Sequence, residues 1–88
     1  MTWQHTPEFE SVHWHFDPAA DCFGRPWPRR RAFVESVTGE PAELVAYEDG
    51  GWGLGLPHRQ YQYVAMGSES DLAAAQQRVF RVWQAMTT

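Results

Sequence analysis

The chain of eighty-eight residues contains no Lys, no Asn and no Ile, and all seven basic side chains are Arg. The missing residue types have A/T-rich codons, so their joint absence indicates a G+C-rich coding sequence. The one cysteine, Cys22, excludes an internal disulfide bond. No apolar run approaches the ~20 residues of a membrane span, and residues 1–5 lack the basic flank and apolar run of a signal peptide. We therefore expect a protein of a reducing cytosol with no membrane association.

Aromatic side chains are plentiful, with five Trp, five Phe and three Tyr. We expect a single domain over residues 1–88, and a domain of this size buries only about 60 to 65 per cent of its unfolded surface. Each buried aromatic removes about 150 to 250 Å² from water, so a few of them form most of the core and leave no space for a roomy pocket. A flexible N-terminus is expected over about residues 1–7, and a long loop over about residues 18–28.

Most of the chain shows the two-residue alternation of strands. It occurs over residues 9–17, where Val12, Trp14 and Phe16 alternate with polar residues. Residues 29–38 fit a strand better than a helix, although the helical alternative stays open. Residues 43–48 and 52–56 flank an Asp-Gly-Gly sequence that is typical of a hairpin turn. In residues 60–66 the alternation places Tyr61, Tyr63 and Ala65 on one face, with Val64 and Met66 on the other.

The clearest helix is the last element, over residues 68–86. Ser68 as N-cap and Asp71 three residues later resemble a capping box, and apolar residues recur at helical spacing. The prediction is an α+β fold, an antiparallel meander sheet of four to five strands with one amphipathic C-terminal helix packed on one face. The residues expected in the core are Trp14, Phe16, Trp52, Leu54, Leu72, Val79 and Trp83.

Two histidines give the chain its one hint of metal chemistry. His13 and His15 would project from the same strand face, and His58 or another ligand could complete a zinc site. Alternating polar residues on a solvent-facing strand look the same, and no further ligand has diagnostic spacing. The glycines of residues 50–55 lack the ending of a phosphate-binding loop. We therefore favour a solvent-facing strand over a zinc site, and we expect no metal, no cofactor and no catalytic residues. Stoichiometric zinc found by elemental analysis would overturn this preference.

The loop and the strand after it carry the predicted partner site. Trp and Arg are the residues that most often supply binding energy at interfaces. The net charge of −4 weakens the case for direct nucleic-acid binding. We expect a partner to contact Trp27 and Arg30, supported by Phe23, Arg25, Arg29 and Arg31. The competing interpretation is that Trp27 closes the bottom of the sheet as a core residue.

Three segments resemble the layout of short proteins from bacteriophages and mobile elements. They read Tyr-Glu-Asp-Gly-Gly-Trp-Gly-Leu at residues 47–54, Tyr-Gln-Tyr-Val-Ala-Met-Gly-Ser at 61–68 and Asp-Leu-Ala-Ala-Ala-Gln at 71–76. That group includes anti-CRISPR proteins and other host-takeover inhibitors, which act by occluding large host complexes. The resemblance implies a non-catalytic inhibitor that binds a host protein or ribonucleoprotein complex in the cytoplasm of a bacterial host cell. The alternatives are a small metalloprotein or enzyme that uses His13 and His15, and an assembly subunit that homodimerises through a sheet edge or the helix.

Overall fold

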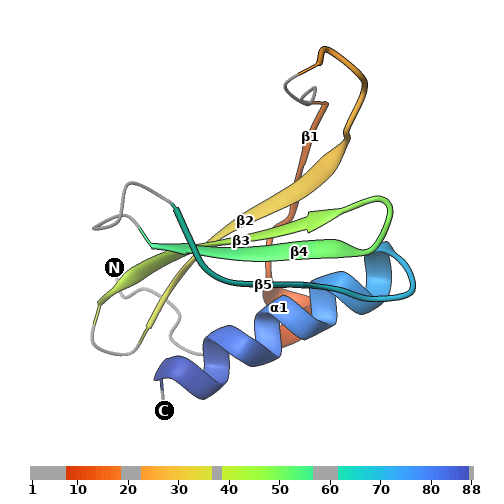
Figure 1. Ribbon diagram of the computed structural model, residues 1–88. Coiled ribbons are helices and arrows are strands. Elements are labelled where there is room, and N and C mark those ends of the chain that lie inside the picture. The colour runs from red at the N-terminus through yellow and green to blue at the C-terminus, as the bar shows by residue number, and fades with distance from the viewer. Residues whose placement is uncertain (1–7, 19–22, 37–38, 57–61, 88) are drawn as a thin grey trace.

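Five strands and one long helix follow each other along the chain (Figure 1). The computed structural model describes residues 8–18, 23–36, 39–56 and 62–87. A short 3-10 turn, Phe9–Ser11, precedes the first strand. The strands are β1 (His15–Asp17), β2 (Arg29–Glu35), β3 (Pro41–Tyr47), β4 (Gly51–Leu56) and β5 (Gln62–Ser68), and the helix α1 spans Leu72–Thr87.

The strands pair in the order β1-β2-β3-β4-β5, and every pair is antiparallel. The predicted meander is therefore confirmed, as is the strand interpretation of residues 29–35. The helix crosses one face of the sheet and packs mainly on β3 and β4 (Figure 1). In the described part of the chain, no helix has both the length and the apolar character that crossing a membrane requires. The N-terminal residues 1–7 and part of the predicted loop, residues 19–22, lie outside the described residues.

The turn between β3 and β4 depends on Gly50. Its φ of +100° lies in the region that favours glycine, as the Asp-Gly sequence predicted. Its carbonyl oxygen accepts a hydrogen bond from the Glu69 N–H at 2.8 Å, so the turn also holds the connection between β5 and α1.

The helix is capped by Asp71. Asp71 Oδ1 accepts a hydrogen bond from the Ala74 N–H at 2.8 Å, which is the N-cap contact to the third helical residue. The prediction of Ser68 as N-cap was wrong, because β5 continues through Ser68 and pairs it with Gly51. The helix consequently begins at Leu72, four residues later than predicted.

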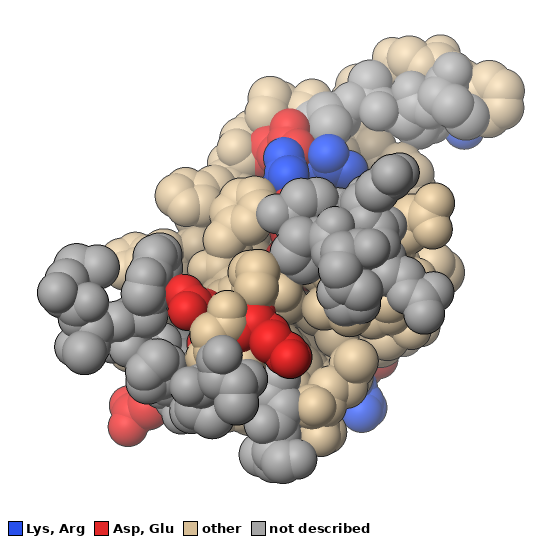
Figure 2. All heavy atoms as spheres, turned by 90° about the vertical axis from the view of Figure 1, so that its left-hand side faces the viewer, with Lys and Arg blue, Asp and Glu red and all other residues tan. Residues whose placement is uncertain are grey.

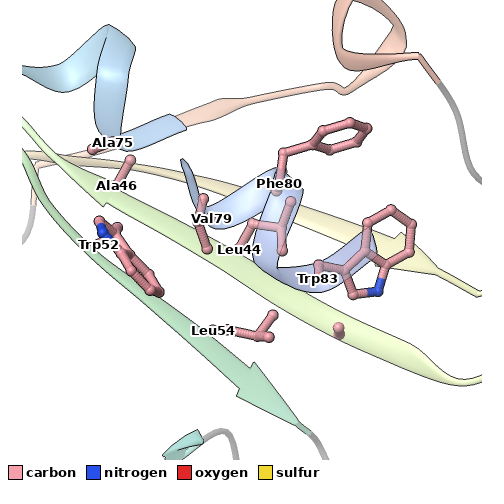
Figure 3. Close-up of a cluster of buried hydrophobic side chains, with 10 residues drawn as sticks. Leu44, Ala46, Trp52, Leu54, Ala75, Val79, Phe80 and Trp83 are labelled. Atoms are coloured by element: carbon pink, nitrogen blue, oxygen red, sulfur yellow. The ribbon is translucent and has the colours of Figure 1, made fainter. Parts of the chain in front are cut away.

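The core lies between α1 and the middle strands. Leu44, Ala46, Trp52 and Leu54 project from the sheet toward Ala75, Val79, Phe80 and Trp83 of the helix (Figure 3). Four of the seven predicted core residues are buried, namely Trp52, Leu54, Val79 and Trp83. Trp14 and Leu72 are partly buried at the margin of this cluster.

The first predicted strand is much shorter than expected, and Phe16 is not a core residue. The chain forms β1 only over His15–Asp17, at the edge of the sheet. Phe16 is 56% exposed because β1 lies beyond the strands that α1 covers. The Arg30 guanidinium carbon lies 4.5 Å from the centroid of the Phe16 ring, so a cation takes the place of a core neighbour.

The pairing of β4 with β5 is irregular, and this irregularity makes the prediction of a shared face for Tyr63 and Ala65 wrong. Leu54 pairs with Ala65 and Gly55 pairs with Tyr63, so Val64 is an extra residue on β5. Ala65 packs against the core, whereas the Tyr63 ring crosses the opposite face beside Gly53. Tyr63 and Ala65 therefore do not share a face as predicted, and Tyr63 lies on the same face as Met66, which pairs with Gly53.

Candidate functional site

The sheet has one face under the helix and a second face, called the open face here, on the side away from α1. Alternate residues of each strand belong to it because side chains alternate across a sheet. Its residues include Arg29, Arg31 and Phe33 of β2, Glu43, Val45 and Tyr47 of β3, Gly51 and Gly53 of β4, and Tyr63 and Met66 of β5.

A groove of about 530 Å³ lies at the end of the sheet where β3 turns into β4. This space differs from the expectation that the aromatics leave no room for a roomy pocket. The expectation considered the enclosed core, whereas the groove opens at the end of the sheet, where the core residue Trp52 forms part of its lining. The residues that line it are Trp27, Tyr47, Asp49, Gly51, Trp52, Tyr63, Met66, Gly67 and Ser68.

The groove is lined by four aromatic residues, Trp27 of the loop, Tyr47 of β3, Trp52 of β4 and Tyr63 of β5. Trp27 stacks on Tyr47, with ring centroids 4.5 Å apart and planes inclined by 23°. Tyr63 lies directly over Gly53, where a β-carbon would come within 2.6 Å of the ring. The absence of a side chain at Gly53 therefore lets the Tyr63 ring lie against the strand.

The two tyrosines are linked by their hydroxyl groups, whose oxygens lie 2.8 Å apart. Burial, together with the hydrogen bond to Tyr47, raises the pKa of Tyr63 above its ordinary value. Of the described residues that line the groove, Asp49 alone carries a charge. Asp49 Oδ1 accepts a hydrogen bond from the Gly51 N–H at 3.0 Å.

An ion-pair network lies on the same face, across β1, β2 and β3. Asp17 accepts hydrogen bonds from Arg29 Nε at 3.0 Å and from Arg31 Nη1 at 3.4 Å, and Arg31 Nη2 donates to Glu43 at 2.6 Å. The hydrogen bond from Arg29 lowers the pKa of Asp17 below its ordinary value, and Arg31 adds to this effect. Figure 2 shows basic side chains directly against acidic ones near the top of the face that it presents. These arginines are therefore partly neutralised by the chain itself.

The six residues of the predicted partner site do not form one surface. Arg29 and Arg31 lie on the open face within the ion-pair network. Arg30 projects to the opposite face, where it covers Phe16 and lies 3.6 Å from Glu48. The alternation of side chains along β2 causes this division.

The remaining three predicted partner residues lie in the loop, where Phe23 and Arg25 contact each other and Trp27 lies apart on Tyr47. Phe23 is 78% exposed, and the Arg25 guanidinium carbon lies 5.3 Å from the centroid of its ring. Trp27 rests on Tyr47 and is 43% exposed, so it is neither a fully buried core residue nor a free loop residue. Among the predicted partner residues, Trp27 is the one that lines the groove.

Sequence reasoning missed Tyr47, Tyr63 and Met66 as site residues. The alternation in β3 gave a signal for Tyr47, since it lies one step out of phase with Leu44 and Ala46. No such signal exists in the sequence for Tyr63. Its face depends on the extra residue Val64, which is seen only in the pairing of β5 with β4.

The structure does not assemble a metal site in its described residues. His13 precedes β1 and His15 begins it, and both are exposed. No group of three or more His, Cys, Asp or Glu side chains comes together within the described ranges. His58 and Cys22 lie outside the described residues.

The groove has the chemical character of a binding site. Its volume falls within the range of about 300 to 1,000 Å³ that ligand pockets occupy, and its lining is aromatic with few polar groups. Such a lining can hold an apolar or a cationic group. No family model, no curated protein and no solved structure matches the chain.

Proposed function

We propose that the chain is a non-catalytic binding protein that contacts its partner through the groove on the open face. The observation that carries the proposal is Trp27, which is stacked on Tyr47 at the wall of the groove and still 43% exposed. Met66 on the same groove is 66% exposed. Exposed aromatic and Met side chains beside a hollow are typical of interface anchors.

The proposed partner is a host protein or ribonucleoprotein complex in a bacterial cytoplasm, and the proposed effect is inhibition by occlusion. The small size of the chain, its net charge of −4 and the resemblance of its layout to phage-encoded inhibitors support this role. An acidic protein of this kind suits a partner whose surface is basic, because complementary charge accelerates association and selects the partner.

The test compares two aromatic residues of one segment. The tagged chain is used to capture partners from a lysate of a G+C-rich bacterial host, alongside Trp27→Ala and the control Phe23→Ala. Phe23 is more exposed than Trp27 but does not line the groove. We expect Trp27→Ala to lose the captured band, since truncation of an interface anchor costs about 2 kcal/mol or more. Phe23→Ala should retain it.

The melting temperature of each variant separates binding from folding. A folded Trp27→Ala that captures the same band as the parent excludes the groove as the contact surface. Loss of capture in Phe23→Ala alone assigns the contact to the loop instead.

The edge strand β5 supports homodimerisation as a second candidate function. Within the described residues β5 pairs with β4 alone, and its seven residues carry no charge. Charged residues normally protect such an edge against pairing with a second strand. A mass in solution of twice 10.1 kDa that halves in Val64→Lys would favour a dimer through β5, and a parent of single-chain mass rejects it.

A further inference from the structure

We propose that the groove binds an arginine side chain of the partner, with the guanidinium group over the aromatic walls and beside the Asp49 carboxylate. This inference rests on the proposed function, because it names what the partner places in the groove. Two properties of the groove carry it: the faces of its rings and the sign of its charge.

The exposed Trp27 ring provides the main attractive surface, because Tyr47 is only 8% exposed beneath it and the Tyr63 ring lies against Gly53. Trp27, Tyr47 and Tyr63 approach the groove from a loop, from β3 and from β5. The face of an aromatic ring carries negative charge density and attracts a cation, with Trp the strongest of the three types. The stack with Tyr47 holds the Trp27 ring in place, and 43% of Trp27 remains accessible.

The chain already uses this chemistry elsewhere on its surface. Arg30 covers Phe16 at 4.5 Å, and Arg31 lies 5.5 Å from the centroid of Phe33. The rings of the groove have no arginine among the described residues that line it. Arg29 interacts with Tyr47 from outside that lining, and its Nε donates to Asp17 Oδ2 at 3.0 Å.

Asp49 supplies the charge that selects a cation. One of its carboxylate oxygens accepts the hydrogen bond from Gly51, and the side chain is exposed. This hydrogen bond uses one oxygen, and the exposed side chain leaves the carboxylate accessible to a ligand. A neutral ligand placed beside Asp49 would remove water from the carboxylate without neutralising its charge, which is unfavourable.

The shape of the ligand favours arginine over lysine. A guanidinium group is planar, stacks on aromatic faces and donates hydrogen bonds to a carboxylate in its own plane. An ammonium group is compact and strongly hydrated, so it gains less from a stacked position. A nucleic-acid phosphate is disfavoured, since the groove presents a carboxylate and no basic lining residue in the described part of the chain.

The experiment uses two probes that differ in charge and share their shape. The ¹⁵N-labelled chain is titrated with N-acetyl-arginine amide and, separately, with N-acetyl-citrulline amide, its neutral counterpart. The Trp27 indole N–H signal, assigned by its loss in Trp27→Ala, reports binding. We expect a saturable shift with the arginine probe and roughly tenfold weaker binding of the citrulline probe, as the loss of a cation–π contact and an ion pair predicts.

Asp49→Asn is the matched variant. Asparagine retains an oxygen for the Gly51 N–H and suits the same turn, so the fold should be unchanged. We expect this variant to bind the arginine probe about two- to fivefold more weakly, because an exposed ion pair contributes up to about 1 kcal/mol, and to bind the citrulline probe as before.

Three outcomes overturn the inference. They are equal binding of the two probes, an unchanged arginine affinity in Asp49→Asn, and no saturable shift up to about 50 mM probe, far above the affinity of a built site. In each case the groove remains the contact surface if Trp27→Ala still loses partner capture. Full capture by a folded Trp27→Ala refutes the proposed function itself, whichever probe binds.

Discussion

The substitution Gly53→Ala tests the geometry of the groove most directly. A β-carbon at this position would lie 2.6 to 2.7 Å from three atoms of the Tyr63 ring, closer than carbon atoms approach in proteins. The ring must therefore tilt away from β4. Because the Tyr63 hydroxyl lies 2.8 Å from that of Tyr47, the tilt also breaks the hydrogen bond between them.

The size of the effect follows from three contributions. Loss of the tyrosine hydrogen bond costs about 1 kcal/mol, and overpacking costs about 1 to 3 kcal/mol. Alanine recovers about 0.5 to 1 kcal/mol, because glycine is unfavourable within a strand. The free energy of unfolding should fall by about 1 to 3 kcal/mol. For a domain of this size, the melting temperature should decrease by roughly 5 to 20 °C.

The assay is thermal unfolding followed by circular dichroism, with Gly51→Ala as the control. A β-carbon at Gly51 would lie 3.3 Å from Asp49 Oδ1 and 3.4 Å from Tyr47 Cδ2, which small shifts can accommodate. The control should change stability by no more than about 0.5 kcal/mol. In a Tyr63→Ala background, Gly53→Ala should lose its penalty, since the two effects are coupled through one contact. Wild-type stability of Gly53→Ala in the native background would refute the placement of the ring.

Three further predictions concern the stability of the fold. Trp83→Ala should destabilise the chain by about 3 to 5 kcal/mol in chemical denaturation, because Trp83 is 1% exposed at the centre of the core. Gly50→Ala should unfold more readily than Gly51→Ala, since the added carbon strains a φ of +100° and overlaps the Glu69 carbonyl group. The pKa of Asp17 is lowered, so its contribution to stability is full above its ordinary value near 3.8 and is lost as the pH falls through the folded-state value. Asp17→Asn should therefore be less stable than the parent at pH 7 and lose less stability on acidification, as melting curves between pH 7 and 2 would show.

The meander and its helix were predictable because their signals are local. The alternation of residues 29–35 and the Asp-Gly turn each depend on a few neighbouring residues. The buried stripe of the helix, with Val79 and Trp83, follows from spacing alone. These features need no knowledge of which strand lies beside which.

The failed predictions depended on tertiary context. The alternation around Phe16 is that of a half-buried strand, but burial also requires an element above it, and the helix does not extend over β1. Ser68 pairs with Gly51 as the last residue of β5, so Asp71 caps the helix in its place. In both cases the local pattern was present, and a distant partner decided its outcome.

The predicted partner residues are divided between two faces of the sheet for a more general reason. Adjacent residues of a strand cannot share a face, so Arg29, Arg30 and Arg31 could act together only in a loop. Once residues 29–35 form β2, the prediction of a joint arginine surface conflicts with the prediction of a strand. The sequence could have shown that Arg30 lies on a different face from Arg29 and Arg31, although it could not have shown that Asp17 and Glu43 pair with the arginines on the open face.

The position of Tyr63 at the groove depends on features of two strands, Gly53 in β4 and the extra residue Val64 in β5. Gly53 provides no side chain to pack, which weakens β4, and the irregularity at Val64 turns Tyr63 over the space so created. The ring covers the strand that the glycine leaves bare and also forms a wall of the groove. Trp27 and Asp49 line the groove outside the buried cluster, whereas Trp83 lies within that cluster under α1. Substitutions at Trp27 or Asp49 should consequently affect binding far more than folding, whereas those at Trp83 should do the reverse.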